Sequence, residues 1–326
     1  MSRSERADLV PAPADSVGAG TIVSVRPAGR YSLLTRTDKL ILTLMVGIPT
    51  ILDFVFIWVP TIASIGLSFT DWRGIGGLTA ANWVGLKNYV FLFTQYVLFW
   101  PALEHNLLWL LFFVCIATPL GMFLAVLRDR DLRGSRIYQN VFFLPVVLSL
   151  AVVGFIWELQ YAPTDGFINN ILGLTKPTNM IDWLGDPTIN LWAVLVAASW
   201  RHVGYIMILY LAGLKSVDPT LREAAAIDGA NERQTFFHVV FPVMAPINTV
   251  IIVVTVIESL RAFDIAYIIN HGKNGLELLS TLITNNSISE ANLIGFGSAI
   301  AVVLLVISLV PIVIYLTRVM RNETTA

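Results

Sequence analysis

The chain has 326 residues, of which 56% are hydrophobic and only 13% are charged, and its formal net charge is −1. Because a soluble domain carries about 25% charged residues, this composition predicts a protein embedded in lipid. The near-neutral net charge argues against a nucleic-acid-binding protein. One cysteine, Cys115, excludes an intramolecular disulfide, and the four histidines lack the spacing of metal ligands.

The first 36 residues differ from the rest of the chain. They contain Pro11, Pro13 and Pro27 with charges of both signs, and they show no apolar periodicity. We interpret residues 1–36 as a disordered cytoplasmic tail rather than a cleaved secretory signal. Residues 37–320 are expected to form the membrane domain, and residues 321–326 a short cytoplasmic tail.

Six stretches are long and apolar enough to cross a membrane as helices, which takes about 20 residues each. They cover residues 40–69, 107–127, 137–159, 189–214, 243–260 and 293–317. The first stretch is long enough to tilt, or to break near Pro60. The sequence therefore predicts an all-α integral membrane protein with six transmembrane helices.

The distribution of Lys and Arg predicts the orientation of these spans. Fifteen of the 21 lie in the two terminal segments and in the loops after the second and fourth spans, and five lie in the other loops. Positive residues favour the cytoplasmic side, so both termini are expected in the cytoplasm.

The cytoplasmic loop 215–242 carries the most specific pattern. Asp218 followed by Pro219 is typical of a helix start, and Gly229 is typical of a helix end. Asn231 and Gln234 have the spacing of a capping box, which predicts a second short helix.

The first of these helices presents small side chains. Leu221, Ala224, Ala225 and Asp228 have helical spacing and are expected to share a face, and Phe236 and Val240 share a face of the second helix. Such a small, flat face suits docking into a groove of another protein. An interfacial helix lying on lipid is the alternative, and these residues alone do not decide between the two.

The loop resembles the "EAA" motif of permease subunits in binding-protein-dependent ABC importers. The matching residues are Glu223, Ala224, Ala225, Asp228, Gly229, Ala230, Phe236 and Pro242. The resemblance implies a type I permease fold, in which this loop is the coupling helix that docks on a separate ATP-hydrolysing subunit.

A wider resemblance covers residue 40 to the end of the sixth span. Segments 68–72, 84–89 and 99–103, together with Asn106 and the Phe263–Asp264 pair, resemble carbohydrate-type permeases of the maltose and glycerol-phosphate kind. The chain departs from that family at 271–274, where His-Gly-Lys-Asn replaces the usual Gly-Gly-Pro.

The resemblance also implies partners and a location. It implies a multi-pass protein of the bacterial cytoplasmic membrane that imports a sugar, an oligosaccharide or a related polyol by alternating access. A second homologous permease, two ATP-binding subunits and an extracytoplasmic solute-binding protein would complete the transporter. The chain itself is then no enzyme and binds no cofactor, because ATP and Mg are used by the ATPase subunits.

Polar residues inside the predicted spans are candidates for a solute path, since charges in lipid are costly. These residues are Asp53, Trp200, Arg201, His202, Gly204, Tyr205, Glu258 and Arg261. They either pair internally and fix helix packing, or line a path for a hydrophilic solute.

Two other classes of protein are less well supported. An ion-coupled secondary transporter or channel would need a coupling-ion site and usually an internal repeat, and the sequence shows neither. A membrane enzyme would need a nucleophile–base pair or a metal set. Lys273 does not lie in a phosphate-binding loop, because the spacing of that motif is absent.

Overall fold

The computed structural model describes residues 35–129, 135–289 and 291–323. Within these ranges the regular elements are helices, and one isolated bridge joins Thr70 to Trp83. The chain divides into two compact units, the first ending at Ile57 and the second beginning at Trp58. The predicted tail up to residue 34 and the last three residues lie outside the described residues.

The first unit is built around α1 (Arg36–Asp53), which begins at a capping box. Thr35 Oγ1 accepts a hydrogen bond from the Asp38 amide at 3.1 Å, and Asp38 Oδ2 accepts one from the Thr35 amide at 2.9 Å. A π-helical turn, Phe54–Trp58, follows α1 and leads into α2 (Val59–Leu67). The break expected near Pro60 is therefore a π-helical turn just before it, and Pro60 lies in the first turn of α2, where its missing N–H costs little.

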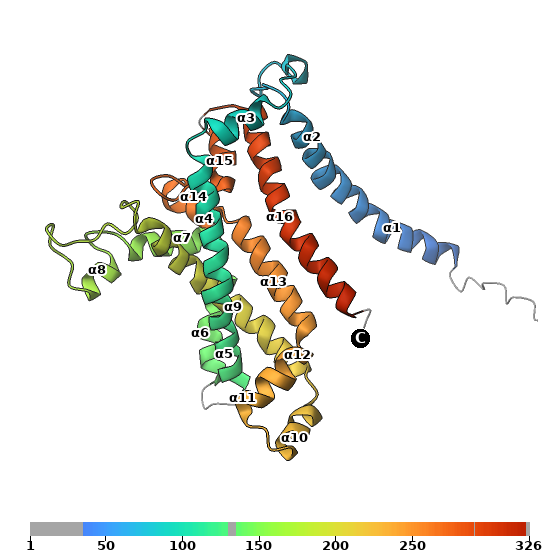
Figure 1. Ribbon diagram of the computed structural model, residues 1–326. Helices are drawn as coiled ribbons and strands as arrows, with labels where there is room; N and C mark the ends of the chain where they lie inside the picture. Colours follow the sequence, from blue (N-terminus) through green and yellow to red (C-terminus); the bar gives the residue numbers. More distant parts are fainter. Residues whose placement is uncertain (1–34, 130–134, 290, 324–326) are drawn as a thin grey trace, which may run out of the picture. The chain divides into compact units, whose positions relative to one another are not determined.

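The second unit contains the remaining helices (Figure 1). A 3₁₀ turn, Leu78–Ala80, precedes α3, and π-helical turns occur at Phe113–Ala117, Phe236–Val240 and Asn285–Ser289. The α-helices are α3 (Lys87–Thr94), α4 (Phe99–Phe112), α5 (Thr118–Asp129), α6 (Ser135–Val147), α7 (Leu150–Gln160), α8 (Phe167–Ile171), α9 (Asn190–Ser216), α10 (Pro219–Ile227), α11 (Glu232–Thr235), α12 (Phe241–Val243), α13 (Ala245–Leu260), α14 (Asp264–Asn270), α15 (Leu279–Thr284) and α16 (Ile294–Glu323).

Helix α9 is the centre of this unit, and two glycines allow its neighbours to approach closely. A Cβ at Gly121 of α5 would lie 2.8 Å from the Cβ of Ile206, and a Cβ at Gly204 of α9 would lie 2.1 Å from the carbonyl oxygen of Phe142 in α6. Neither distance leaves room for a side chain. Helices α5 and α6 therefore pack backbone to backbone against α9.

Two of the six predicted spans are broken. The stretch 137–159, expected as one helix, consists of α6 and α7, which meet at 109°. Ser149 causes the break, because its extended backbone leaves α6 and its Oγ accepts the Val152 amide at 3.3 Å, which caps α7. Pro145 in the last turns of α6 weakens that helix end as well.

The second break, of 76°, lies at Met244, between α12 and α13. The fifth span was predicted to begin at residue 243, directly after Pro242, but Pro242 and residue 243 lie in the short α12, and α13 begins at Ala245 with Pro246 in its first turn. Together with four straight apolar runs, the two bent pairs account for the six predicted spans within the described ranges, so the all-α membrane fold is confirmed.

Polar side chains connect the segments at the end of the unit away from α10. Asn88 Nδ2 donates to the carbonyl oxygens of Ser68 and Thr70 at 2.8 Å each, which joins the two segments 68–72 and 84–89. The buried Asn106 of α4 accepts the Leu279 amide at 2.9 Å. Figure 1 shows α3 and α15 at this end, opposite α10 and α11.

Candidate functional site

The loop between α9 and α13 has the predicted helix–turn–helix form. Asp218 Oδ1 accepts the Thr220 amide at 2.9 Å and caps α10, with Pro219 as its first residue. Hydrogen bonds from the backbone and the side chain of Thr220 lower the pKa of Asp218. A depressed pKa means that the carboxylate cap is intact at neutral pH and is lost only as the pH falls through that lowered value.

The exposed side of α10 differs in part from the predicted face. Of the four residues expected to share that face, Leu221, Ala224 and Asp228 are exposed, but Ala225 is only 8% exposed. Glu223 is also exposed, and Ile227 is 86% exposed. The sequence did not indicate Ile227, because an isolated isoleucine in a helix is more often a core residue.

The turn after α10 is stabilised by its own backbone. Gly229 has φ +80°, a left-handed conformation that side chains other than glycine adopt at a cost. The amide of Ala230 reaches back to the carbonyl of Ala225 at 3.0 Å and closes the helix end. Asn231 and Gln234 then form a capping box, with both hydrogen bonds at 2.9 Å, as their spacing predicted.

The second half of the loop is anchored in the bundle. The π-helical turn Phe236–Val240 follows α11, and both of its end residues pack into a hydrophobic cluster with Ala125, Leu214 and Met244. Phe236 and Val240 therefore share a face, as predicted. Pro242, the last residue of the motif, is exposed.

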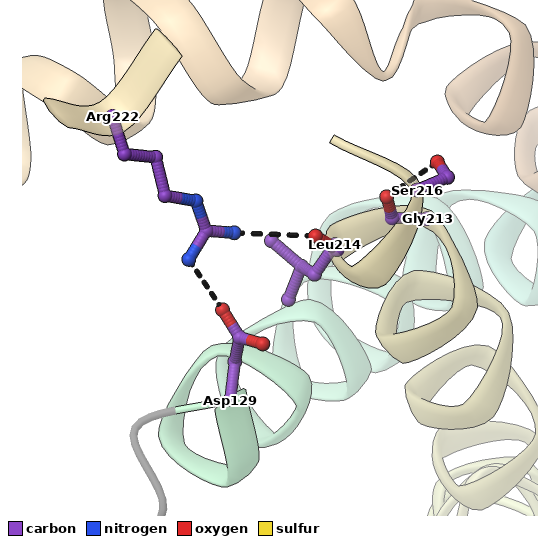
Figure 2. A network of polar contacts seen from close by, with 5 residues as sticks. All are labelled: Asp129, Gly213, Leu214, Ser216 and Arg222. Atoms are coloured by element: carbon purple, nitrogen blue, oxygen red, sulfur yellow. Dashed lines mark hydrogen bonds and ion pairs between the residues drawn. The ribbon is translucent and has the colours of Figure 1, made fainter. Parts of the chain in front are cut away.

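Arg222 connects α10 to the helix bundle, a role that the sequence did not indicate. Its Nη1 donates to Asp129 Oδ2 at 2.8 Å and its Nη2 to the Leu214 carbonyl at 3.2 Å (Figure 2). Asp129 lies in the last turn of α5 and Leu214 in the last turn of α9. Arg222, Asp129 and Leu214 also line a cavity of about 290 Å³, together with residues of the loop such as Ala226 and Phe236.

A second polar region lies between the spans. Arg201, His202 and Tyr205 of α9 and Glu258 of α13 line one cavity of about 230 Å³. Another of about 40 Å³ is lined by Arg201, His202 and Glu258 as well, and in addition by Arg261 and Asp264. The structure thus brings together five of the eight intramembrane residues singled out from the sequence.

The charges around these cavities are not paired with one another. No ion pair joins Arg201, Glu258 and Arg261 in the part of the chain that the structure describes, where Nε of Arg201 also has no hydrogen-bond partner. His202 is 5% exposed, and its Nε2 lies 3.5 Å from Thr255 Oγ1. Unpaired charges beside a cavity fit a hydrated path better than internal pairing.

The other three candidates lie elsewhere. Trp200 packs edge to face on Trp157, with ring centroids 5.9 Å apart. Gly204 lies at the crossing of α6 and α9. Asp53 is the last residue of α1 in the first unit, where its side chain is exposed.

Comparisons with known proteins agree with this architecture. A probable ABC transporter permease of Pyrococcus horikoshii is 34% identical over 82% of this chain and 91% of its own length. The xylose/arabinose import permease XacH of Haloferax volcanii is 33% identical over 81% of this chain and 83% of its own length.

A solved structure shares the fold. The crystal structure of a bacterial alginate ABC transporter, in complex with a periplasmic protein bound to an alginate pentasaccharide, matches with a TM-score of 0.72 and 22% identity. The match covers 86% of this chain and 93% of that one. The sequence pattern of one family matches residues 117–322, a range that contains the loop and the residues lining the cavity of about 230 Å³. The chain therefore belongs to the family of binding-protein-dependent transport system inner membrane components, which confirms the resemblance to ABC importer permeases.

Proposed function

We propose that this permease imports a sugar, an oligosaccharide or a related polyol, driven by ATP hydrolysis in separate subunits. The observation that carries the proposal is the loop 218–242, which is already folded as a capped helix with an exposed face through Glu223, Ala224 and Ile227. A preformed, exposed helix loses little conformational entropy when it docks on a partner.

The class of solute is supported by the relatives and by the cavities. The relative in Haloferax volcanii is named for xylose and arabinose import, and the structural neighbour belongs to an alginate transporter. Arg201 and Glu258 supply hydrogen-bond donors and acceptors for hydroxyl groups, and Tyr205 adds an aromatic surface. This mixture suits a solute rich in hydroxyl groups.

The complete transporter requires further chains. In the proposed assembly, a second homologous permease completes the path, two ATP-binding subunits supply the energy, and an extracytoplasmic solute-binding protein delivers the solute. Both termini and loop 215–242 lie in the cytoplasm, as the distribution of Lys and Arg indicates. Closure of the ATPase subunits would move the two coupling helices and turn the cavity from one side of the membrane to the other.

The charge at Glu223 provides the test of docking. Glu223→Arg replaces an exposed acid in the middle of α10 and places a repulsive charge against any basic site that receives it. We expect this variant to insert in the membrane normally. The amount of ATPase subunit that co-purifies with it should be lower than with the wild type. Gly229→Asp puts a side chain on a residue with φ +80° and strains the turn. This variant should abolish uptake.

Asp165→Arg is the matched control, since it makes the same charge change at an exposed position in the loop before α9. It should recover the ATPase subunit at the wild-type level. If Glu223→Arg also recovers the wild-type amount, α10 is an interfacial helix and the docking proposal is wrong.

A further inference from the structure

The coupling helix α10 has few packing contacts of its own with the spans. It packs mainly against α11 and the π-helical turn, which belong to the same loop. Between α10 and the ends of α5 and α9 lies the cavity of about 290 Å³. Packing therefore connects α10 to these two spans mainly indirectly, through Phe236 and Val240 of the π-helical turn.

Arg222 bridges that gap with one side chain and two partners. One end nitrogen donates to Asp129 on α5 at 2.8 Å, and the other donates to the Leu214 carbonyl on α9 at 3.2 Å (Figure 2). The planar guanidinium holds both partners in a fixed geometry, which a flexible ammonium group would not do. The side chain of Asp129 is only 19% exposed, which limits screening of the pair by solvent.

Arg222 stabilises two groups that their own helices leave unfavourably placed. Asp129 is the last residue of α5, where the helix dipole disfavours an anion. Leu214 lies in the last turn of α9, where carbonyl groups have no partner within the helix. A cation placed between the two helix ends satisfies both.

The two helices held by Arg222 pack closely against each other. Gly121 brings α5 against Ile206 of α9, and Ala125, Ile206 and Leu214 belong to one buried cluster. Helix α9 in turn carries Arg201, His202 and Tyr205 at the cavity between the spans. A continuous set of contacts thus leads from α10 through Arg222 to the residues proposed to meet the solute.

We propose that Arg222 is the positioning residue that couples α10 to the α5–α9 pair, so that movement of the docked helix is transmitted to the cavity. This inference rests on the proposed docking of α10. The pair lies at helix ends and the Arg222 side chain is 38% exposed, so the pair adds less to stability than a fully buried one would. Removal of the pair therefore leaves the fold and the docking face in place and breaks the transmission between them.

The test uses the purified transporter with its ATPase subunits and a reporter at the cavity. In a Cys115→Ser background, Tyr205→Cys is labelled with a water-soluble maleimide, with and without a non-hydrolysable ATP analogue. With Arg222 intact, the analogue should change the labelling rate. With Arg222→Ala, ATPase recovery and ATP hydrolysis should remain while the change in labelling is lost.

Three further variants make the result specific. Arg233→Ala removes an arginine with an exposed side chain from the same loop and should respond like the parent. Asp129→Asn, which is nearly isosteric, should lose most of the response. The reversed pair, Arg222→Asp with Asp129→Arg, should regain part of it, because the ion pair returns but the contact with Leu214 does not.

Each other outcome has a definite meaning. A full labelling response in Arg222→Ala would overturn the inference, as would a reversed pair no better than the single variants. Loss of ATPase recovery in Arg222→Ala would show that Arg222 shapes the docking face and does not transmit its movement. If even the parent recovers no ATPase subunit, the proposed function fails, and the coupling role of Arg222 fails with it.

Discussion

Arg201 and Glu258 place opposite charges inside a membrane protein without an ion pair between them in the described ranges. A charge at the centre of a span costs about 2.5–3.5 kcal/mol by insertion scales. Hydration in the cavity of about 230 Å³ lowers that cost, since this volume is ample for water and the lining is polar. Water in this cavity would therefore offset part of the cost of the unpaired charges.

Water access to this cavity can be measured with cysteines. In a Cys115→Ser background, we expect Tyr205→Cys and Glu258→Cys to react with a water-soluble thiol reagent in at least one nucleotide state. The control is Val203→Cys. Val203 follows the cavity-lining His202 in the sequence but is only 6% exposed, so its cysteine should stay unreactive. Complete protection of both cavity positions in every state would support a purely structural role for these polar residues.

Single residues also show what the sequence could and could not predict. Asp218, Gly229, Asn231 and Gln234 were identified correctly, because capping and turn rules depend on residues within a few positions of one another. Arg222 was missed, because its partner Asp129 lies 93 positions away in the chain. No local pattern predicts a contact of that range.

At the scale of elements, apolar length predicted where each span lies but not its shape. The run 137–159 is predominantly apolar, and the 109° turn between α6 and α7 lies at a serine cap within it. Similarly, the fifth span was predicted from residue 243, but α13 begins only at Ala245, after a short separate helix that contains Pro242. Bends of this kind depend on single capping residues and prolines, which apolar length does not specify.

The crossing of α6 and α9 makes a sharp prediction for stability. Gly204→Ala would place a Cβ 2.1 Å from the Phe142 carbonyl oxygen, a backbone atom that cannot rotate away. Overpacking of this kind costs about 1–3 kcal/mol, so the thermal midpoint in detergent should fall. The control is Gly66→Ala, where a Cβ meets nothing within 4 Å, and which should leave the midpoint unchanged. Equal midpoints for the two variants would contradict the close crossing.

At the scale of the whole molecule, the account depends on which end faces the cytoplasm. Loop 161–189 and α10 flank the two ends of α9, a helix long and apolar enough to cross a membrane, and the distribution of Lys and Arg assigns α10 to the inside. Reporter fusions after Thr175 and after Asn231 should therefore report opposite compartments, with the first outside. The same compartment for both fusions would refute the six-span topology.

The central claim is that the exposed face of α10 meets a separate ATPase subunit rather than lipid. Ile227, 86% exposed on that face, is the position that distinguishes the two environments most directly. The decisive measurement places a photoreactive cross-linker on Ile227→Cys in a Cys115→Ser background, in native membranes, with the buried Ala225→Cys as control. We predict an adduct between the Ile227 position and an ATP-binding subunit, identified by mass spectrometry, and none from Ala225. Cross-linking of Ile227 to lipid alone would contradict the account.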